Sequence, residues 1–133
     1  MGVRMTLWEI FEADFTKNHA NREYSREDAR KAIQAYLDGG GEHFDADLCF
    51  AVFRDRGDFT AEFHCFNAGD GRVLVKTVDD MATALAGRFS RMVTYHDNPR
   101  INEIAAFLRT PHRYSRIDQG IDRTYELVLY TRS

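Results

Sequence analysis

The sequence predicts an α+β domain in which helices cover both faces of a mixed, mostly antiparallel sheet. Two helical segments precede two strands, a strand–helix–strand segment fills the middle, and two alternating strands come last. Hairpins pair strands antiparallel, whereas a helical crossover joins parallel strands. At 133 residues the chain is the size of one domain, so we expect a single domain over residues 1–133.

Two amphipathic helices open the chain. Residues 6–18 place Leu7, Phe11 and Phe15 at helical spacing. Residues 25–38 form a second apolar stripe that begins after Ser25, a good N-cap residue. Three consecutive glycines then end this helix.

A strand pair follows the second helix. Residues 47–54 and 59–67 have strand composition, and residues 55–58 have hairpin chemistry. In the second strand one face is apolar, while the other carries Glu62 and His64. We interpret the preceding acidic and histidine residues as a polar loop and predict no metal site, because they lack further ligands elsewhere; they are Glu42, His43, Asp45 and Asp47.

The second half of the chain alternates strands and helices. A glycine loop leads into a helix over 72–87, and residues 91–95 form a short strand. Asn98 and Pro99 suit the cap and first position of another helix, which Pro111 closes. The predicted closing strands span 112–118 and 122–131.

Composition and charge exclude several classes of protein. Hydrophobic residues make up 44% and charged residues 29%, as in an ordinary globular domain, and the net charge of −3 disfavours a nucleic-acid partner. The first residues carry acids where a signal peptide needs an apolar core, and no apolar run reaches membrane length. Cys49 and Cys65 are expected to be buried thiols in a reducing compartment, so we predict a cytoplasmic protein without a membrane partner.

The segment between the second strand and the third helix carries a candidate anion site. Ala68-Gly69-Asp70-Gly71 connects them. Glycines let a backbone approach a phosphate, and a helix N-terminus presents free N–H groups. A tight strand-to-helix turn would need the same residues, so both interpretations stay open. No Lys-Ser/Thr pair follows, which excludes a P-loop.

Element order over residues 47–131 resembles the GCN5-related N-acetyltransferase (GNAT) family, and two motifs support the resemblance. That family binds the pyrophosphate of acetyl-CoA with a Q/R-x-x-G-x-G/A loop. The stretch 66–71 matches both glycines but has Phe66 at the Gln/Arg position. Asn98 resembles the Asn that opens a later helix in the family, whereas that helix's usual Tyr has no counterpart. The family's first strand is weak or absent, and the compact form is similar to acetyltransferase-like proteins of bacteriophages.

The resemblance implies acetyl transfer from acetyl-CoA, as co-substrate and without a metal, to an amine on a small molecule or a protein. The implied cofactor-binding residues are Phe66, Asn67, Ala68, Gly69, Asp70, Gly71, Arg72 and Asn98. The implied catalytic residues are Glu62, as the base on the mixed strand face, and His64, as its partner or substitute. Tyr95 and Tyr114 are alternatives for the acid that protonates the thiolate.

Two alternatives to an enzyme remain open. The missing Gln/Arg and Tyr favour an inactive interaction protein on the same fold, phage-encoded and acting on a host protein. A plain α+β binding module is the third hypothesis. Arginine dominates the cations, since only three of 18 basic residues are lysine, which would suit contacts with phosphates or an acidic protein.

Overall fold

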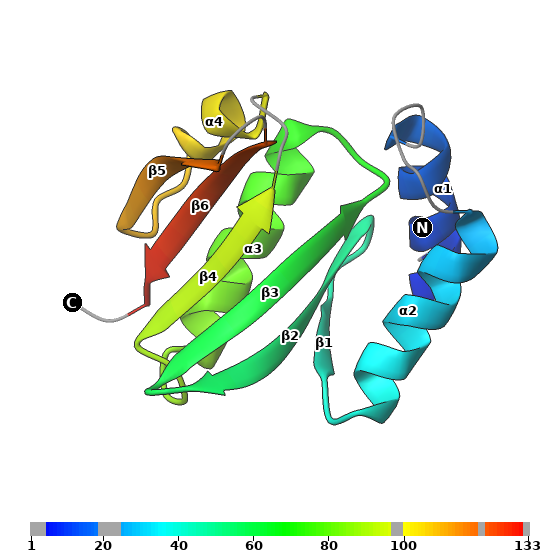
Figure 1. The fold of residues 1–133 in the computed structure, drawn as a ribbon, viewed down its shortest axis with the longest axis horizontal. Coiled ribbons are helices and arrows are strands. Elements are labelled where there is room, and N and C mark those ends of the chain that lie inside the picture. The colour runs from blue at the N-terminus through cyan, green and yellow to red at the C-terminus, as the bar shows by residue number, and fades with distance from the viewer. Residues whose placement is uncertain (1–4, 19–24, 97–99, 120–121, 132–133) are drawn as a thin grey trace.

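The computed structural model describes residues 5–18, 25–96, 100–119 and 122–131. In them a six-stranded sheet has the strand order β1-β2-β3-β4-β6-β5 (Figure 1). The strands are β1 (Glu42–Asp45), β2 (Cys49–Gly57), β3 (Thr60–Asn67), β4 (Arg91–His96), β5 (His112–Gln119) and β6 (Asp122–Tyr130). The helices are α1 (Leu7–Asn18), α2 (Arg26–Asp38), α3 (Gly71–Leu85) and α4 (Arg100–Ala105).

The predicted sheet class is confirmed. Strands β3 and β4 pair in parallel, and the other four neighbouring pairs are antiparallel. The parallel pair is the one that α3 connects, as a helical crossover requires.

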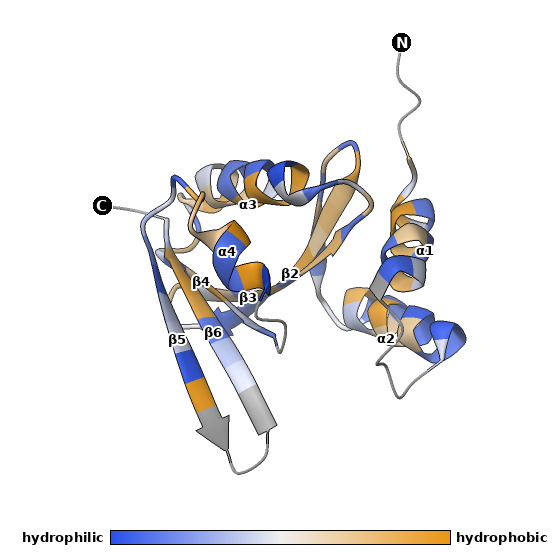
Figure 2. Ribbon diagram, turned by 90° about the horizontal axis from the view of Figure 1, so that it is seen from above, coloured by the Kyte–Doolittle hydropathy of each residue, from blue (hydrophilic) through white to orange (hydrophobic). Residues whose placement is uncertain are grey.

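Side-chain alternation along the strands separates two hydrophobic clusters on opposite faces of the sheet. On β2, Ala51 and Phe53 face the cluster beneath α3, while Phe50 and Val52 face the cluster beneath α1 and α2. Figure 2 shows α3 and α4 above the sheet, while α1 and α2 pack against β2 and β3 on the other face. The sheet is therefore covered on both faces, but by different helices at different places.

The helix boundaries follow the capping chemistry. The Ser25 hydroxyl accepts from the Asp28 N–H at 3.1 Å, which confirms the predicted N-cap of α2. At its other end, Gly39 N–H donates to Ala35 O, and Gly40 adopts φ +101°, where a glycine is favoured.

The polar segment before β2 was expected to be a loop, and that prediction is wrong for Glu42–Asp45. These residues form the edge strand β1, antiparallel to β2. Backbone pairing needs no apolar side chains at a sheet edge, and charged residues are common on edge strands. Only Phe44 in this strand reaches the core.

Two further boundaries differ from the sequence prediction. Strand β2 continues to Gly57, so the hairpin turns at Asp58 and Phe59, which both have positive φ (57° and 55°), as a tight two-residue hairpin turn requires. Helix α4 ends at Ala105, well before Pro111. The Asp79 carboxylate of α3 accepts from the backbone N–H groups of Arg109 and Thr110, which holds that segment as a loop.

Candidate active site

Strands β3 and β4 separate partway along their length. They pair only from Thr60 to Glu62 against Arg91 to Val93, although β3 continues to Asn67 and β4 to His96 (Figure 1). Beyond Glu62 the backbone of β3 has no partner on the β4 side among the described residues. The parallel pairing expected from the helical crossover is confirmed, and the two strands part toward their C-terminal ends.

The glycine loop lies at the end of β3, and Asn67 shapes it. The Asn67 side chain accepts from Gly69 N–H at 2.9 Å and donates to the carbonyls of Gly69 and Asp70. A Cβ on Gly69 would stand 2.7 Å from the Val73 side chain, so this position requires glycine. Gly71 has room, because its nearest neighbour would be Ile104 at 3.5 Å.

Two side chains of helix α1 also form hydrogen bonds at the glycine loop. The ammonium of Lys17 donates to the Gly69 carbonyl at 2.9 Å, and Asn67 N–H donates to the buried carboxylate of Asp14 at 2.8 Å. The loop conformation is therefore fixed by a helix that lies 50 residues away in the sequence.

The N-terminus of α3 is closed by its own N-cap. Asp70 Oδ1 accepts from the N–H groups of Arg72 and Val73, at 3.0 and 3.1 Å. The expectation of free N–H groups at this helix start is wrong for these two, because the Asp carboxylate caps the helix. The Arg72 side chain is 97% exposed, with its Nε 3.8 Å from Asp70.

The remaining residues of the predicted cofactor set differ in their accessibility. The Phe66 ring stacks on Phe50 (4.8 Å between centroids) in the cluster beneath α1, so only its backbone faces the loop. Ala68 N–H donates to Leu48 O at 2.8 Å. Asn98 lies outside the described residues.

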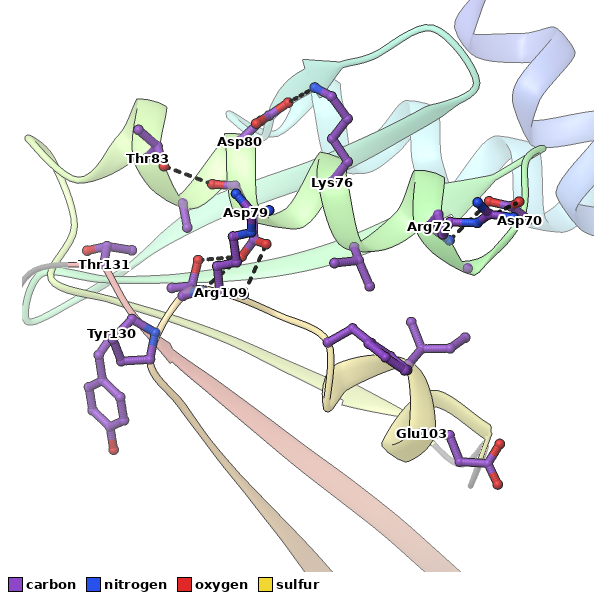
Figure 3. A pocket seen from close by; sticks show the side chains of 17 residues that line it. Asp70, Arg72, Lys76, Asp79, Asp80, Thr83, Glu103, Arg109, Tyr130 and Thr131 are labelled. Atoms are coloured by element: carbon purple, nitrogen blue, oxygen red, sulfur yellow. Dashed lines mark hydrogen bonds and ion pairs between the residues drawn. The ribbon is translucent and has the colours of Figure 1, made fainter.

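A pocket of about 1240 Å³ lies between α3 and α4, next to the glycine loop (Figure 3). Asp70, Gly71 and Arg72 line one end, and Tyr130 and Thr131 line the other. Its charged lining is mixed: Arg72, Lys76 and Arg109 against Asp70, Asp79, Asp80 and Glu103. Sequence reasoning located the loop end of this pocket but not its extension along α3.

Glu62 and His64 lie together on the face of β3 opposite α3. Glu62 pairs with Arg54 of β2 at 3.6 Å, and its side chain is 24% exposed. The His64 ring meets Tyr36 of α2 edge-on at 6.0 Å. Burial lowers the pKa of His64, so its imidazole is neutral at neutral pH and is able to accept a proton.

The two tyrosines considered as acids lie on opposite faces of the sheet. Tyr95 accepts a hydrogen bond from Arg56 at 2.9 Å on the Glu62 face. On the α4 face, the Tyr114 hydroxyl contacts His96 Nε2, and both rings lie near Tyr125. Burial, with a smaller contribution from Tyr125, raises the pKa of Tyr114 to about 12, so it stays a proton donor at neutral pH.

Other chemistry finds little support in the described residues. Burial raises the pKa of the Cys49 thiol to about 11 and that of Cys65 well above its usual value, so both thiols are protonated at neutral pH. Across the described ranges, no three His, Cys, Asp or Glu residues cluster as metal ligands. Nor is any helix there long and apolar enough to cross a membrane.

Sequence reasoning missed five residues that shape this region. Asp14 and Lys17 reach the loop. Tyr36 and Arg54 contact Glu62, and Arg56 donates to Tyr95 on the same face. Register along β2 places Arg54 opposite Glu62, and strand alternation puts both on one face, so a correct hairpin alignment would have found that pair. The contacts from α1 and α2 are tertiary and have no local signal.

Comparison with known proteins shows which fold this chain shares. No family model and no curated protein matches the sequence. Solved structures do match, and the following three are N-acetyltransferases. A variant of the spermidine N-acetyltransferase of Vibrio cholerae aligns with TM-score 0.58 and 11% identity over 97% of this chain and 94% of that one. The Salmonella typhimurium enzyme that modifies the N-terminal serine of a 50S ribosomal protein gives 0.63 and 13% over 93% and 87%.

A third match is the Campylobacter jejuni N-acetyltransferase PseH in complex with acetyl-CoA, with TM-score 0.54 and 15% identity over 95% of this chain and 92% of that one. The chain therefore has the acyl-CoA N-acyltransferase fold of the GNAT proteins, as the sequence resemblance implies. At these identities the likeness establishes the fold alone.

Proposed function

We propose that this protein is an acyl-CoA-dependent N-acyltransferase that moves an acetyl group from acetyl-CoA to an amine. The observation that carries the proposal is the separation of β3 from β4 directly beside the Gly69–Gly71 loop and the pocket between α3 and α4. This combination offers an unpaired strand edge, a glycine loop and a groove in one continuous region. The acetyl-CoA complex among the structural neighbours supports the same co-substrate.

In the proposed mode, the pyrophosphate lies at the glycine loop. No described residue accepts a hydrogen bond from Gly71 N–H, and the N–H groups of Arg72 and Val73 become available when the Asp70 side chain turns away. Arg72 adds a charge-assisted contact from its exposed position. The pantetheine arm then lies along the unpaired edge of β3, whose backbone N–H and C=O groups hold it.

The residues proposed to act as the base lie on the sheet face opposite α3. The amine attacks the thioester carbonyl, a C–N bond forms, the C–S bond breaks, and CoA leaves as the thiol. Glu62 takes the ammonium proton, with the neutral His64 beside it on the same face as partner or substitute. Tyr114 retains its proton at neutral pH, which suits the role of the acid, although it lies on the α4 face.

A second candidate has a specific observation in its favour. The Asp70 carboxylate occupies two of the amides that would bind pyrophosphate and places a negative charge there. With Phe66 at the Gln/Arg position and no Tyr in the later helix, this favours an inactive interaction protein on the same fold. The bacteriophage origin and the cytoplasmic location stay predictions.

One assay separates the two candidates. A panel of small amines and peptide N-termini is incubated with acetyl-CoA and the protein, and free thiol is measured. Thiol release above the rate without enzyme, dependent on the amine, supports the transferase. No release with any acceptor would remove the enzyme and leave the interaction protein.

A further inference from the structure

Beyond α1 and α2, no described helix covers the sheet face that carries Glu62. Among the described helices, α1 and α2 pack against β2 and β3 on this face, and α3 and α4 lie on the opposite face (Figure 2). On this face Val93 and Val128 are buried, whereas the Arg113 side chain of β5 is 64% exposed and that of Glu126 on β6 is 21% exposed. This surface adjoins the point where β3 and β4 separate.

Guanidinium groups stand out from this face while carboxylates lie against it. The pairs Arg54–Glu62 and Arg113–Glu126 both have N···O distances of 3.6 Å. In each pair the arginine side chain is far more exposed, at 55% and 64%, than its carboxylate, at 24% and 21%. A molecule approaching from solvent thus meets the cations first.

The two pairs are also loose. At 3.6 Å their separations exceed the roughly 2.7–2.9 Å of a charge-assisted hydrogen bond. The Arg54 guanidinium also lies over the Tyr36 ring, 5.0 Å from its centroid. No described group accepts a close hydrogen bond from either guanidinium, so their N–H groups can turn toward a ligand. Arginine presents these donors as a planar fork that matches a carboxylate or a phosphate.

Arg56 extends the cationic surface across the sheet. It starts on β2, donates to the Tyr95 hydroxyl of β4 at 2.9 Å, and so passes over β3, where Glu62 lies. The hydrogen bond to Tyr95 raises the pKa of Arg56, and the charges of Glu62 and Glu126 add to the rise. Arg56 has no carboxylate partner among the described ion pairs, so its charge is available to a ligand.

From this surface we infer that the acceptor is an amine carrying an anionic group, a carboxylate or a phosphate. The inference rests on the proposed transferase function. The anion binds Arg54 and Arg56, which places the amine of a short acceptor near Glu62 and His64. Acetyl then moves from the CoA sulfur to that nitrogen, and the ammonium proton passes to Glu62 or His64. A polycationic acceptor such as spermidine is repelled by the same guanidiniums.

An acceptor series tests the inference directly. Ethanolamine, O-phosphoethanolamine, β-alanine and spermidine are compared by thiol release, with kcat/KM expressed per unprotonated amine. We expect O-phosphoethanolamine or β-alanine to exceed ethanolamine at least about tenfold, which corresponds to about 1.4 kcal/mol. The two anionic acceptors distinguish phosphate from carboxylate. Spermidine or ethanolamine as the best acceptor would overturn the inference while leaving the transferase intact.

The variant Arg56→Gln tests whether the preference for anionic acceptors arises from the sheet face that carries Glu62. It should lower the kcat/KM ratio of the preferred anionic acceptor to ethanolamine at least about fivefold, mainly through KM. Because both acceptors use the same base, a change in the base cancels in this ratio. Arg26→Gln is the matched control: Arg26 pairs with Glu12 and is 51% exposed, but it lies on α2. An unchanged ratio in Arg56→Gln would contradict the assignment.

A binding experiment without acetyl-CoA distinguishes a failure of the anion site from a failure of the transferase proposal. O-phosphoethanolamine and β-alanine are titrated into the protein without acetyl-CoA and followed by NMR, with Arg56→Gln in parallel. Binding that Arg56→Gln weakens, without turnover of any amine, would overturn the transferase but support the anion site. Absence of both binding and turnover would overturn both proposals.

Discussion

The two faces of the sheet at the β3–β4 separation differ in how their charged groups are arranged. On the α3 side, Asn67 and Asp70 accept from N–H groups of the glycine loop and of the start of α3, and the adjoining pocket has charged residues of both signs. On the Glu62 side, carboxylates lie against the sheet and guanidiniums extend into solvent. An acid thus caps the amides at the start of α3, while on the other face the arginine side chains are more exposed than their carboxylate partners.

This difference shows how one strand can serve two chemistries. Side chains alternate along β3, so Ala61 and Phe63 build the core beneath α3 while Glu62 and His64 face the opposite side. In the proposed transferase, this alternation would keep the base on one face of the sheet and the phosphates of acetyl-CoA on the other. The Asp70 cap remains the feature that fits least well with a phosphate site.

The largest expected effect is on the Glu62 face. Glu62→Gln should lower acetyl transfer by at least about 10²-fold at neutral pH, because a general base is lost. The deficit should shrink as pH rises, since more of the amine is already deprotonated. Thiol release measures the rate, and acetyl-CoA titration should show unchanged binding.

Glu126→Gln is the control for this variant. Glu126 has nearly the same exposure and the same 3.6 Å arginine pair on the same face, but it lies on β6. If both variants lose activity equally, the charge of the face matters and Glu62 is not the base.

On the other face, the two glycines should respond with opposite signs. Gly69→Ala places a Cβ 2.7 Å from the stiff Val73 side chain and should destabilise the fold by about 1–3 kcal/mol. Gly71→Ala meets only ordinary contact with Ile104 and should be neutral or stabilising by up to about 1 kcal/mol. Urea unfolding compares them; equal stability would mean that the loop packs differently.

Removing the Asp70 cap of α3 tests whether its carboxylate obstructs CoA binding on the α3 side of the sheet. Asp70→Gly frees the Arg72 and Val73 amides and removes a charge, so CoA should bind about tenfold tighter. Asp70→Ser keeps a cap but removes the charge and should give an intermediate affinity. Weaker CoA binding in Asp70→Gly would show that the carboxylate supports the site rather than obstructing it.

The smallest effect concerns the pH dependence of stability. Burial lowers the pKa of His64 in the folded state below its unfolded value, so the unfolded chain binds the proton more readily. Its contribution is fully present above the unfolded pKa of about 6.5 and is lost as pH falls through the folded pKa. His64→Gln should therefore flatten the fall in Tm between pH 7 and 5. A fall as steep as in the unchanged protein would assign it to other groups.

Local patterns were sufficient where a residue acts on its own segment. The Ser25 cap, the alternation along β3 and the turn at Gly69–Gly71 all appear as predicted, because each depends on nearby residues. Strand β1 was missed because edge pairing is made by backbone groups that carry no hydrophobic signal. The end of α4 was missed because Asp79 of α3, which holds the following loop, is about 30 residues away.

The residues of the candidate site likewise divide into those that local sequence predicts and those that depend on tertiary contacts. Glu62 and His64 were found from strand alternation, and the loop from its glycines. The sequence shows that Asp70 places a negative charge in the loop. It does not show that the Asp70 carboxylate accepts hydrogen bonds from the helix amides, because that depends on three-dimensional geometry. Arg54 and Arg56 surround Glu62 through strand register and a contact to Tyr95, neither of which a single strand reveals.

The most direct test of the central claim is calorimetric titration of acetyl-CoA and CoA into the unchanged protein and into Gly71→Val. A Cβ at this position has space, with Ile104 at 3.5 Å, so loss of binding would reflect blocked backbone approach, provided that Tm is unchanged. The transferase account predicts saturable binding of both ligands, weakened at least about tenfold, or about 1.4 kcal/mol, in Gly71→Val. Absence of binding, or equal affinity in the folded variant, would contradict it.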